Sequence, residues 1–88
     1  MTYVYLLQSP KTKQIYIGFT ENLKRRFNEH QQIQKHKGWR LIYYEAYLRR
    51  EDAVKREQML KHYGNAKQSL LKRLEISLKD CDPLEGVE

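Results

Sequence analysis

The fold of this chain is decided by residues 2–20, which read TYVYLLQSPKTKQIYIGFT. Residues 2–8 and 15–20 are rich in the aromatic and β-branched side chains that strands favour. The polar residues between them include the serine and proline that are common in turns. This stretch therefore predicts a β-hairpin. Because alternate residues of a strand share a face, Tyr5 and Tyr16 are expected to meet across it.

A helix is expected directly after the hairpin. Thr20 carries a side chain that can cap its first turn, and the helix is expected to run to about Gln34. Its buried face is marked by residues at four-then-three spacing, which are Leu23, Phe27 and His30. Residues 35–38 then form a short connection.

A third strand is predicted for residues 40–47, which read RLIYYEAY. Its apolar and aromatic residues occupy both faces, which favours a central position in the sheet. A second helix is predicted for residues 49–63, with Gly64 ending it. That helix is supported by acid and base residues four apart, namely Glu51 with Lys55, Asp52 with Arg56, and Glu57 with Lys61.

The last predicted helix begins at Asn65, which can act as its N-cap with Gln68 three residues on, in a capping-box arrangement. Its apolar stripe consists of Leu70, Leu71, Leu74 and Leu78. The order ββαβαα predicts an α+β domain, in which helices flank a small three-stranded antiparallel or mixed sheet. With 88 residues in all, we expect one domain over residues 1–79 and a flexible C-terminal tail over residues 80–88.

The charge of the chain favours a polyanionic partner. Seventeen Lys and Arg against eleven Asp and Glu give a net charge of +6, which is typical of proteins that bind nucleic acid. Six lysines can steer such a partner or simply keep the surface soluble, namely Lys13, Lys24, Lys35, Lys37, Lys55 and Lys67.

Other features of the sequence exclude several classes of protein. Its apolar runs fall far short of the about 20 residues of a membrane span, and its first residues do not resemble a signal peptide. We therefore expect a cytoplasmic protein with no membrane partner. The single cysteine, Cys81, excludes a disulfide or a cysteine-based zinc cluster within one chain. The sequence also has no GxxxxGK[ST], GxGxxG, HExxH or GxSxG motif.

Two tripeptides of the hairpin resemble the paired signature of the GIY-YIG nucleases, namely Tyr3-Val4-Tyr5 and Tyr16-Ile17-Gly18. The resemblance covers roughly residues 2–75 and continues through TxNLxxRxxxH from residue 20, WRLIYYE from residue 39 and RExxLK from residue 56. It is strongest to the small single-domain branch of the family, which is similar to the N-terminal incision domain of the bacterial excision-repair nuclease.

The resemblance implies a metal-dependent endonuclease that hydrolyses phosphodiester bonds, with DNA as the expected substrate and DNA repair as the setting. It implies one divalent metal, Mg²⁺ or Mn²⁺, and no small-molecule cofactor. Without an attached DNA-recognition domain, targeting is expected to rest on substrate structure or on a partner protein. By the same resemblance, the catalytic residues are Tyr5, Tyr16, Arg26 and His30, and the metal ligand is Glu57. Candidates for nucleic-acid binding are Gly18, Lys13, Lys24, Arg25 and Lys67.

Each assignment has a plainer alternative. Arg26 has planar donors that suit a phosphate, but an arginine on a helix is commonly solvated. Glu57 falls on the same helical face as Ala53 and Leu60, where a carboxylate needs a partner; that partner is either a metal or Lys61, four residues on. A tyrosine base needs a nearby cation, because a free phenol has a pKa of about 10.

His30 is either a hydrogen-bonded core residue or a contact to the phosphate or leaving group. Gly18 allows either a close approach or a strand bulge. The sequence departs from the family signature at Tyr3 and Val4, and Phe19 stands where some members carry a basic residue. Besides an endonuclease, two other functions fit the sequence: a non-catalytic nucleic-acid-binding module and a protein-interaction adaptor.

Overall fold

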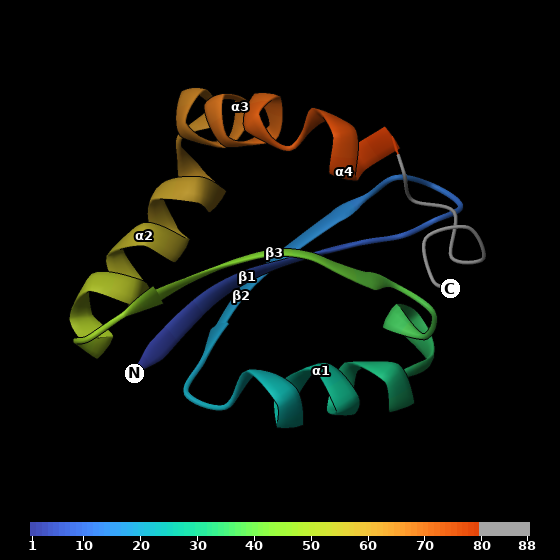
Figure 1. Cartoon of the computed structure of the whole chain (residues 1–88), viewed down its shortest axis with the longest axis horizontal. Helices are drawn as coiled ribbons and strands as arrows, with labels where there is room; N and C mark the ends of the chain where they lie inside the picture. Colours follow the sequence, from blue (N-terminus) through green and yellow to red (C-terminus); the bar gives the residue numbers. More distant parts are fainter. Residues whose placement is uncertain (80–88) are drawn as a thin grey trace.

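The computed structural model describes residues 1–79, so the expected tail over residues 80–88, with Cys81, lies outside the described residues. The elements follow one another in the order β1 (Thr2–Gln8), β2 (Ile15–Thr20), α1 (Leu23–Gln32), η1 (Gln34–His36), β3 (Arg40–Tyr47), α2 (Arg50–His62), α3 (Gly64–Arg73) and α4 (Glu75–Lys79). This order confirms the predicted α+β fold with a hairpin at its start (Figure 1). No helix among the described residues is long and apolar enough to cross a membrane.

The three strands form an antiparallel sheet in the order β2-β1-β3. The central strand is therefore β1, and the prediction of a central position for residues 40–47 is wrong. The reason is that the aromatic residues of β3 are only partly covered, and Tyr44 is 53% exposed. The residues that are buried on both faces belong to β1, where Val4 and Tyr5 are 0% and 1% exposed.

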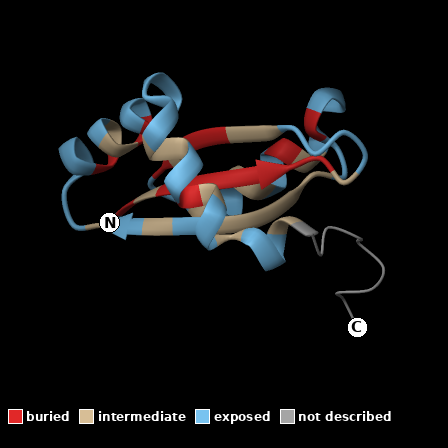
Figure 2. Cartoon of the chain, turned by 90° about the horizontal axis from the view of Figure 1, so that it is seen from above, coloured by how far each residue is buried: buried red, intermediate tan, exposed pale blue. Residues whose placement is uncertain are grey.

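The two faces of the sheet have different roles. Helices α2 and α3 cover one face and α1 covers the other (Figure 1). On the α2 face, Val4 and Leu6 pack with Ile17 of β2 and with Leu60 of α2 in the apolar core. Side chains alternate between faces, so Tyr5 points instead towards α1. Buried residues concentrate in the sheet and on the helix surfaces that face it (Figure 2).

A partly buried ion pair attaches α2 to β3. Arg56, which helix spacing pairs with Asp52, directs its guanidinium to Glu45, with Nε 3.0 Å from Oε1 and Nη2 3.0 Å from Oε2. The same carboxylate accepts hydrogen bonds from the Tyr43 hydroxyl at 2.6 Å and the Tyr47 hydroxyl at 2.5 Å. Burial raises the pKa of Glu45, but these donors outweigh it and hold the pKa below its usual value.

The ends of the helices differ in detail from the predictions. The N-cap of α1 is Asn22, whose Oδ1 accepts from the Arg25 N–H at 3.0 Å. Thr20 is still part of β2, and its Oγ1 instead accepts from the Asn22 N–H at 3.1 Å. Helix α1 ends at Gln32, two residues before the expected Gln34.

The chain also breaks earlier than expected between α2 and α3. Tyr63 is extended, with φ −116° and ψ 105°, so it ends α2 and precedes α3, which begins at Gly64 rather than after Asn65. The predicted leucine stripe does not lie on one helix, because α3 ends at Arg73 and Leu78 belongs to α4.

We predict that Glu45→Gln lowers the free energy of unfolding by about 2 kcal/mol at pH 7, since hydrogen bonds to a charged group are lost. A carboxyl with a lowered folded-state pKa contributes stability above its unfolded pKa of about 4.3, and loses it as pH falls through the folded value. Urea unfolding from pH 7 to pH 2.5 should therefore show the gap between variant and wild type closing in acid. A gap that stays constant over this range would contradict the assignment.

Candidate active site

Four of the five residues to which the family resemblance assigns catalysis or metal binding come together on the α1 face of the sheet. Tyr5 lies on β1, Tyr16 on β2, and Arg26 and His30 on α1. The Tyr5 hydroxyl is 2.8 Å from His30 Nε2. The ring centroids of Tyr5 and Tyr16 are 6.2 Å apart, and those of Tyr16 and His30 are 4.9 Å apart. The two tyrosines thus meet across the hairpin, as the alternation predicts.

Gly18 leaves the space that Tyr5 occupies. It pairs directly with Tyr5 in the β1–β2 ladder, and the register of this pair of strands is regular. A Cβ on Gly18 would lie 2.7 Å from the Tyr5 hydroxyl oxygen and 3.0 Å from Cε2 of Tyr16. The close approach expected at Gly18 is therefore made by a side chain of the protein, and the glycine is needed to seat Tyr5 beneath α1.

The Arg26 guanidinium lies beside the hydroxyls of both tyrosines. Its pKa is raised, first by its hydrogen bond with Tyr5 and then by Glu29, whose Oε1 is 3.0 Å from Nη1. The side chain is 40% exposed, so it is neither buried nor fully solvated. Burial raises the pKa of Tyr5 to about 12 although Arg26 lowers it in part. The Tyr5 phenol therefore keeps its proton at neutral pH.

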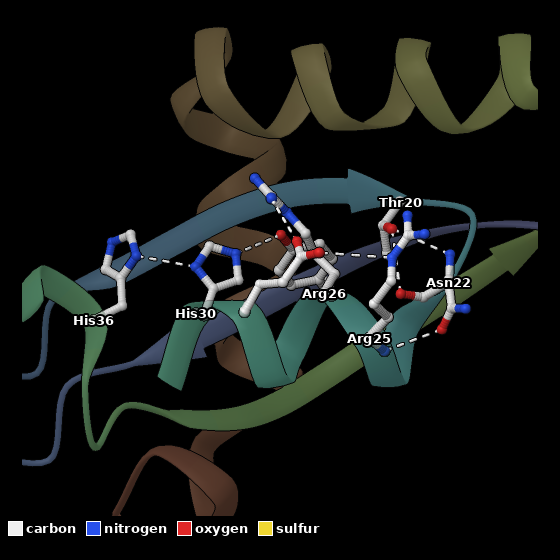
Figure 3. Close-up of polar contacts among 8 residues, drawn as sticks. Thr20, Asn22, Arg25, Arg26, His30 and His36 are labelled. Carbon is white, nitrogen blue, oxygen red and sulfur yellow. Dashed lines mark hydrogen bonds and ion pairs between the residues drawn. The ribbon is translucent and has the colours of Figure 1, made fainter. Parts of the chain in front are cut away.

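A chain of hydrogen bonds continues from Tyr5 through two histidines. His30 Nδ1 is 3.0 Å from His36 Nδ1, and Figure 3 shows the two rings joined in this way. Burial lowers the pKa of both imidazoles. Tyr5 keeps its proton, so its O–H can donate to His30 Nε2. A neutral His30 then carries its proton on Nδ1 and donates to His36.

His36 is the residue that sequence reasoning missed. It was expected in a connecting segment, yet it is only 8% exposed. Its ring lies 4.7 Å from that of Tyr16 and 4.8 Å from that of Trp39, measured between centroids. The segment is held by Gln31, whose side chain bonds the Gly38 N–H at 3.1 Å and the Trp39 carbonyl at 2.9 Å. No periodicity marks His36, because a 3₁₀ turn carries it.

Glu57 does not join the other four residues directly. It lies on α2, which packs on the opposite face of the sheet, as Figure 3 shows with α2 across the top. Glu57 is 8% exposed, and its Oε2 is 2.8 Å from Lys61 Nζ, the pairing that helix spacing predicts. Lys61 also lines a recess of about 340 Å³ together with Tyr16. This recess thus links Tyr16 with Lys61, the partner of Glu57.

The possible metal ligands among the described residues fit one kind of metal site. No group of three or more His, Cys, Asp or Glu side chains gathers within residues 1–79. A fully protein-held ion does not match this donor set. A single buried carboxylate does match Mg²⁺ or Mn²⁺, which are commonly bound through one or two carboxylates, with waters and substrate phosphate completing the shell. Lys61, whose side chain is 44% exposed, can move away from Glu57 to release it.

The residues expected to bind nucleic acid divide into two groups. Lys13 and Lys67 line a recess of about 590 Å³ beside Tyr16 and His36. Lys24 and Arg25 lie on the exposed surface of α1, where Arg25 Nε is 3.6 Å from the Glu29 carboxylate. Only the first group is adjacent to the candidate active site.

The hairpin thus presents two tyrosines to an arginine and a histidine of the next helix, in a small α+β domain, which is the arrangement that the family resemblance implies. The family model described as the GIY-YIG catalytic domain matches residues 1–72, so this chain belongs to the GIY-YIG family. It is also 35% identical over 68 residues to a UPF0213 protein of Limosilactobacillus reuteri (strain DSM 20016), a match that covers 68% of this chain and 70% of that protein. No solved structure matches the chain.

We predict that Gly18→Ala displaces the Tyr5 ring, because the added methyl would overlap the hydroxyl oxygen. Overpacking of this kind costs typically about 1–3 kcal/mol. Thermal unfolding should show the loss, and the histidine resonances of His30 and His36 should shift in NMR spectra. Gly64→Ala is the matched control, since a Cβ there meets nothing within 4 Å. Equal behaviour of the two variants would refute the packing role of Gly18.

Proposed function

We propose that this protein is an endonuclease that hydrolyses phosphodiester bonds of nucleic acid, with DNA as the expected substrate and one Mg²⁺ or Mn²⁺ as cofactor. The observation that supports it most is the placement of Arg26 beside both tyrosine hydroxyls, in a domain that belongs to the GIY-YIG family. Phosphodiester hydrolysis needs an activated water, stabilisation of charge on the phosphoryl oxygens, and help for the leaving oxygen. Cytoplasmic location and a role in DNA repair stay predictions.

The exposure of the four residues separates their roles. Tyr5 and His30 are each 1% exposed, so neither can touch a substrate without a rearrangement. Tyr16 and Arg26 are partly exposed. We therefore assign contact with the scissile phosphate to these two, and assign Tyr5 and His30 to holding them in position.

Arg26 suits the phosphoryl group because its fork of donors matches two phosphate oxygens. Its ion pair with Glu29 is half exposed, and a phosphate can replace that carboxylate. Tyr16 lies next to the same cation, which is what a tyrosine needs in order to accept a proton from the attacking water. This choice between the two tyrosines rests on exposure, which sequence periodicity does not report.

Glu57 is the residue that would hold the divalent ion. A bound ion would polarise the phosphoryl oxygens and stabilise the leaving oxygen. The contribution of the chain is to keep one buried glutamate on α2, with Lys61 neutralising its carboxylate until a cation and a substrate arrive. A desolvated carboxylate without any partner would be costly, so this exchange preserves the fold.

A second candidate function follows from the same ion pair. With Glu57 bound to Lys61 and separated from Tyr5 by the sheet, the domain could act as a nucleic-acid-binding module without cutting. Such a module would bind equally well in EDTA and would leave its ligand intact after metal is added.

The experiment that tests the proposal is cleavage of labelled branched, nicked and single-stranded DNA and RNA with Mg²⁺ or Mn²⁺. Arg26→Gln and Glu57→Gln are each expected to lower the cleavage rate by at least about 100-fold, the usual effect of removing one charge-stabilising group. Arg25→Gln is the matched control, because Arg25 is the neighbouring arginine, is 69% exposed and pairs with the same Glu29. Binding without any cutting by wild type would favour the second candidate function.

We predict a positioning role for His36, which fixes the tautomer of His30 through Nδ1. His36→Phe keeps an aromatic ring against Tyr16 but removes the acceptor, and should lower kcat about 10-fold or more with little change in KM. His36→Asn places an amide oxygen near the lost Nδ1 and should restore much of the rate. Two variants with equal kcat would show that His36 only packs.

A further inference from the structure

We propose that the recess beside Tyr16 and His36 is a subsite for one unpaired nucleotide, with Trp39 stacking on the base and three lysines binding the flanking phosphates. The ligand class is single-stranded nucleic acid, or an unpaired segment of a duplex, next to the bond to be cut. This inference deepens the proposed function and rests on it for the identity of the polymer.

The recess has the size and position of a ligand site. Its volume of about 590 Å³ falls in the range of about 300–1,000 Å³ that is usual for small-molecule sites. Three separate segments of the chain form it: the hairpin turn with Lys13, the η1 region with Lys35 and Trp39, and α3 with Lys67. Tyr16 and His36 form its border with the candidate active site.

Among the described residues, the recess is lined by positively charged side chains and by no negatively charged ones. Lys13, Lys35 and Lys67 line it, and its described lining contains no Asp or Glu. A concave surface lined by one sign of charge attracts the opposite charge. Phosphates of a nucleic acid are therefore the expected ligand groups, and their affinity should depend on salt.

Trp39 supplies the contact to a base. Its side chain is partly exposed in the recess, and its ring rests against His36 at 4.8 Å between centroids in an edge-to-face contact. Its backbone is fixed at both polar atoms, since its N–H bonds the His36 carbonyl at 3.1 Å and its carbonyl accepts from Gln31. An exposed aromatic ring among lysines is the arrangement by which proteins hold single strands. Bases inside a duplex are stacked on each other, so an unpaired base is required.

Lys13 adopts a left-handed backbone conformation in the hairpin turn. Its φ of 65° lies in the left-handed region, where glycine or asparagine is favoured. The turn is closed by the hydrogen bond from its N–H to the Ser9 carbonyl at 3.0 Å. A glycine would make the same turn without strain. A strained lysine whose side chain lines a recess points to a use for its charge, because strain of this kind gathers at ligand sites.

The subsite is continuous with the candidate active site. Tyr16 and Lys67 line this recess and also the smaller recess that contains Lys61, the partner of Glu57. A strand that places a base on Trp39 therefore leads past Tyr16 towards Lys61, the partner of Glu57. The unpaired nucleotide accordingly lies directly beside the scissile phosphate.

The experiment uses Trp39 itself, which is the only tryptophan of the chain. Wild-type protein in EDTA is titrated with dT12, with rU12, with a 12-mer of abasic deoxyribose phosphates and with a blunt 12-base-pair duplex. Stacking predicts strong quenching of tryptophan fluorescence by dT12 or rU12, weaker binding of the duplex, and little quenching by the abasic strand. Equal affinity and equal quenching with the abasic strand would overturn the proposal. The two base-containing strands show whether deoxyribose or ribose is preferred.

Variants locate the site by anisotropy of fluorescein-labelled dT12. Trp39→Leu should weaken binding about 5- to 150-fold, the range found for loss of one stacked base. Tyr44→Leu, which removes an exposed aromatic of β3, should not weaken it.

The lysines are tested by the dependence of dT12 affinity on salt concentration. Lys35→Gln should reduce the slope of this dependence by about 0.7, and Lys37→Gln, two residues away and outside the recess, should leave the slope unchanged. Equal effects of Lys35→Gln and Lys37→Gln would refute the subsite.

Lys13→Gly is a variant in which binding can be lost without any loss of stability. It removes one cation and relieves the left-handed strain, so its Tm should equal or exceed that of wild type while binding weakens. Binding as tight as that of wild type would exclude Lys13 from the subsite. Because all these measurements are made in EDTA, a protein that binds dT12 through Trp39 but never cuts would refute the proposed nuclease activity alone.

Discussion

The hydrogen bond between the Tyr5 hydroxyl and His30 Nε2 is the interaction on which the candidate site depends. It joins the central strand to α1, and it exists only because Gly18 leaves room for the phenol on the neighbouring strand. Once Tyr5 is held there, Arg26 one turn earlier on α1 lies beside the same hydroxyl, and His36 follows through the far nitrogen of His30. The buried part of this network, Tyr5, His30 and His36, is hydrogen-bonded and therefore rigid, which suits a site that must hold a phosphate in one geometry.

The sheet divides the molecule into a structural face and a chemical face. On one face, Val4 and Leu6 pack with Leu60 of α2, and the Glu45–Arg56 ion pair ties α2 to β3. The other face holds the polar network beneath α1. Because β1 is central, each of its side chains is committed to one face by alternation alone. Glu57 belongs to the structural face, where it pairs with Lys61, and Lys61 lines a recess beside Tyr16 of the edge strand β2.

Local chemistry accounts for what was predicted correctly, and its failures have identifiable causes. The hairpin was predicted from strand formers around a polar turn. The meeting of the Tyr5 and Tyr16 side chains on one face was predicted from period-two alternation. The predicted central position of β3 was wrong, because an edge strand that packs beside β1 can also carry aromatic residues on both faces. Thr20 did not cap α1 because it is the last residue of β2, so Asn22 took that position. His36 was missed because its burial arises from contacts with Tyr16 and Trp39, which are far from it or irregularly spaced in sequence.

The sequence by itself determined the order of strands and main helices, the shared face of Tyr5 and Tyr16, and the family, because these depend on propensity, periodicity and short motifs. Only the tertiary structure decided the strand order, the exposure that separates Tyr16 and Arg26 from Tyr5 and His30, and the partners of Glu57 and Arg56. The physical reason is that burial and pairing depend on which elements pack together. Residues distant in sequence compete for the same polar groups. Helix spacing alone therefore does not predict that Arg56 pairs with Glu45 on β3 while Glu57 pairs with Lys61.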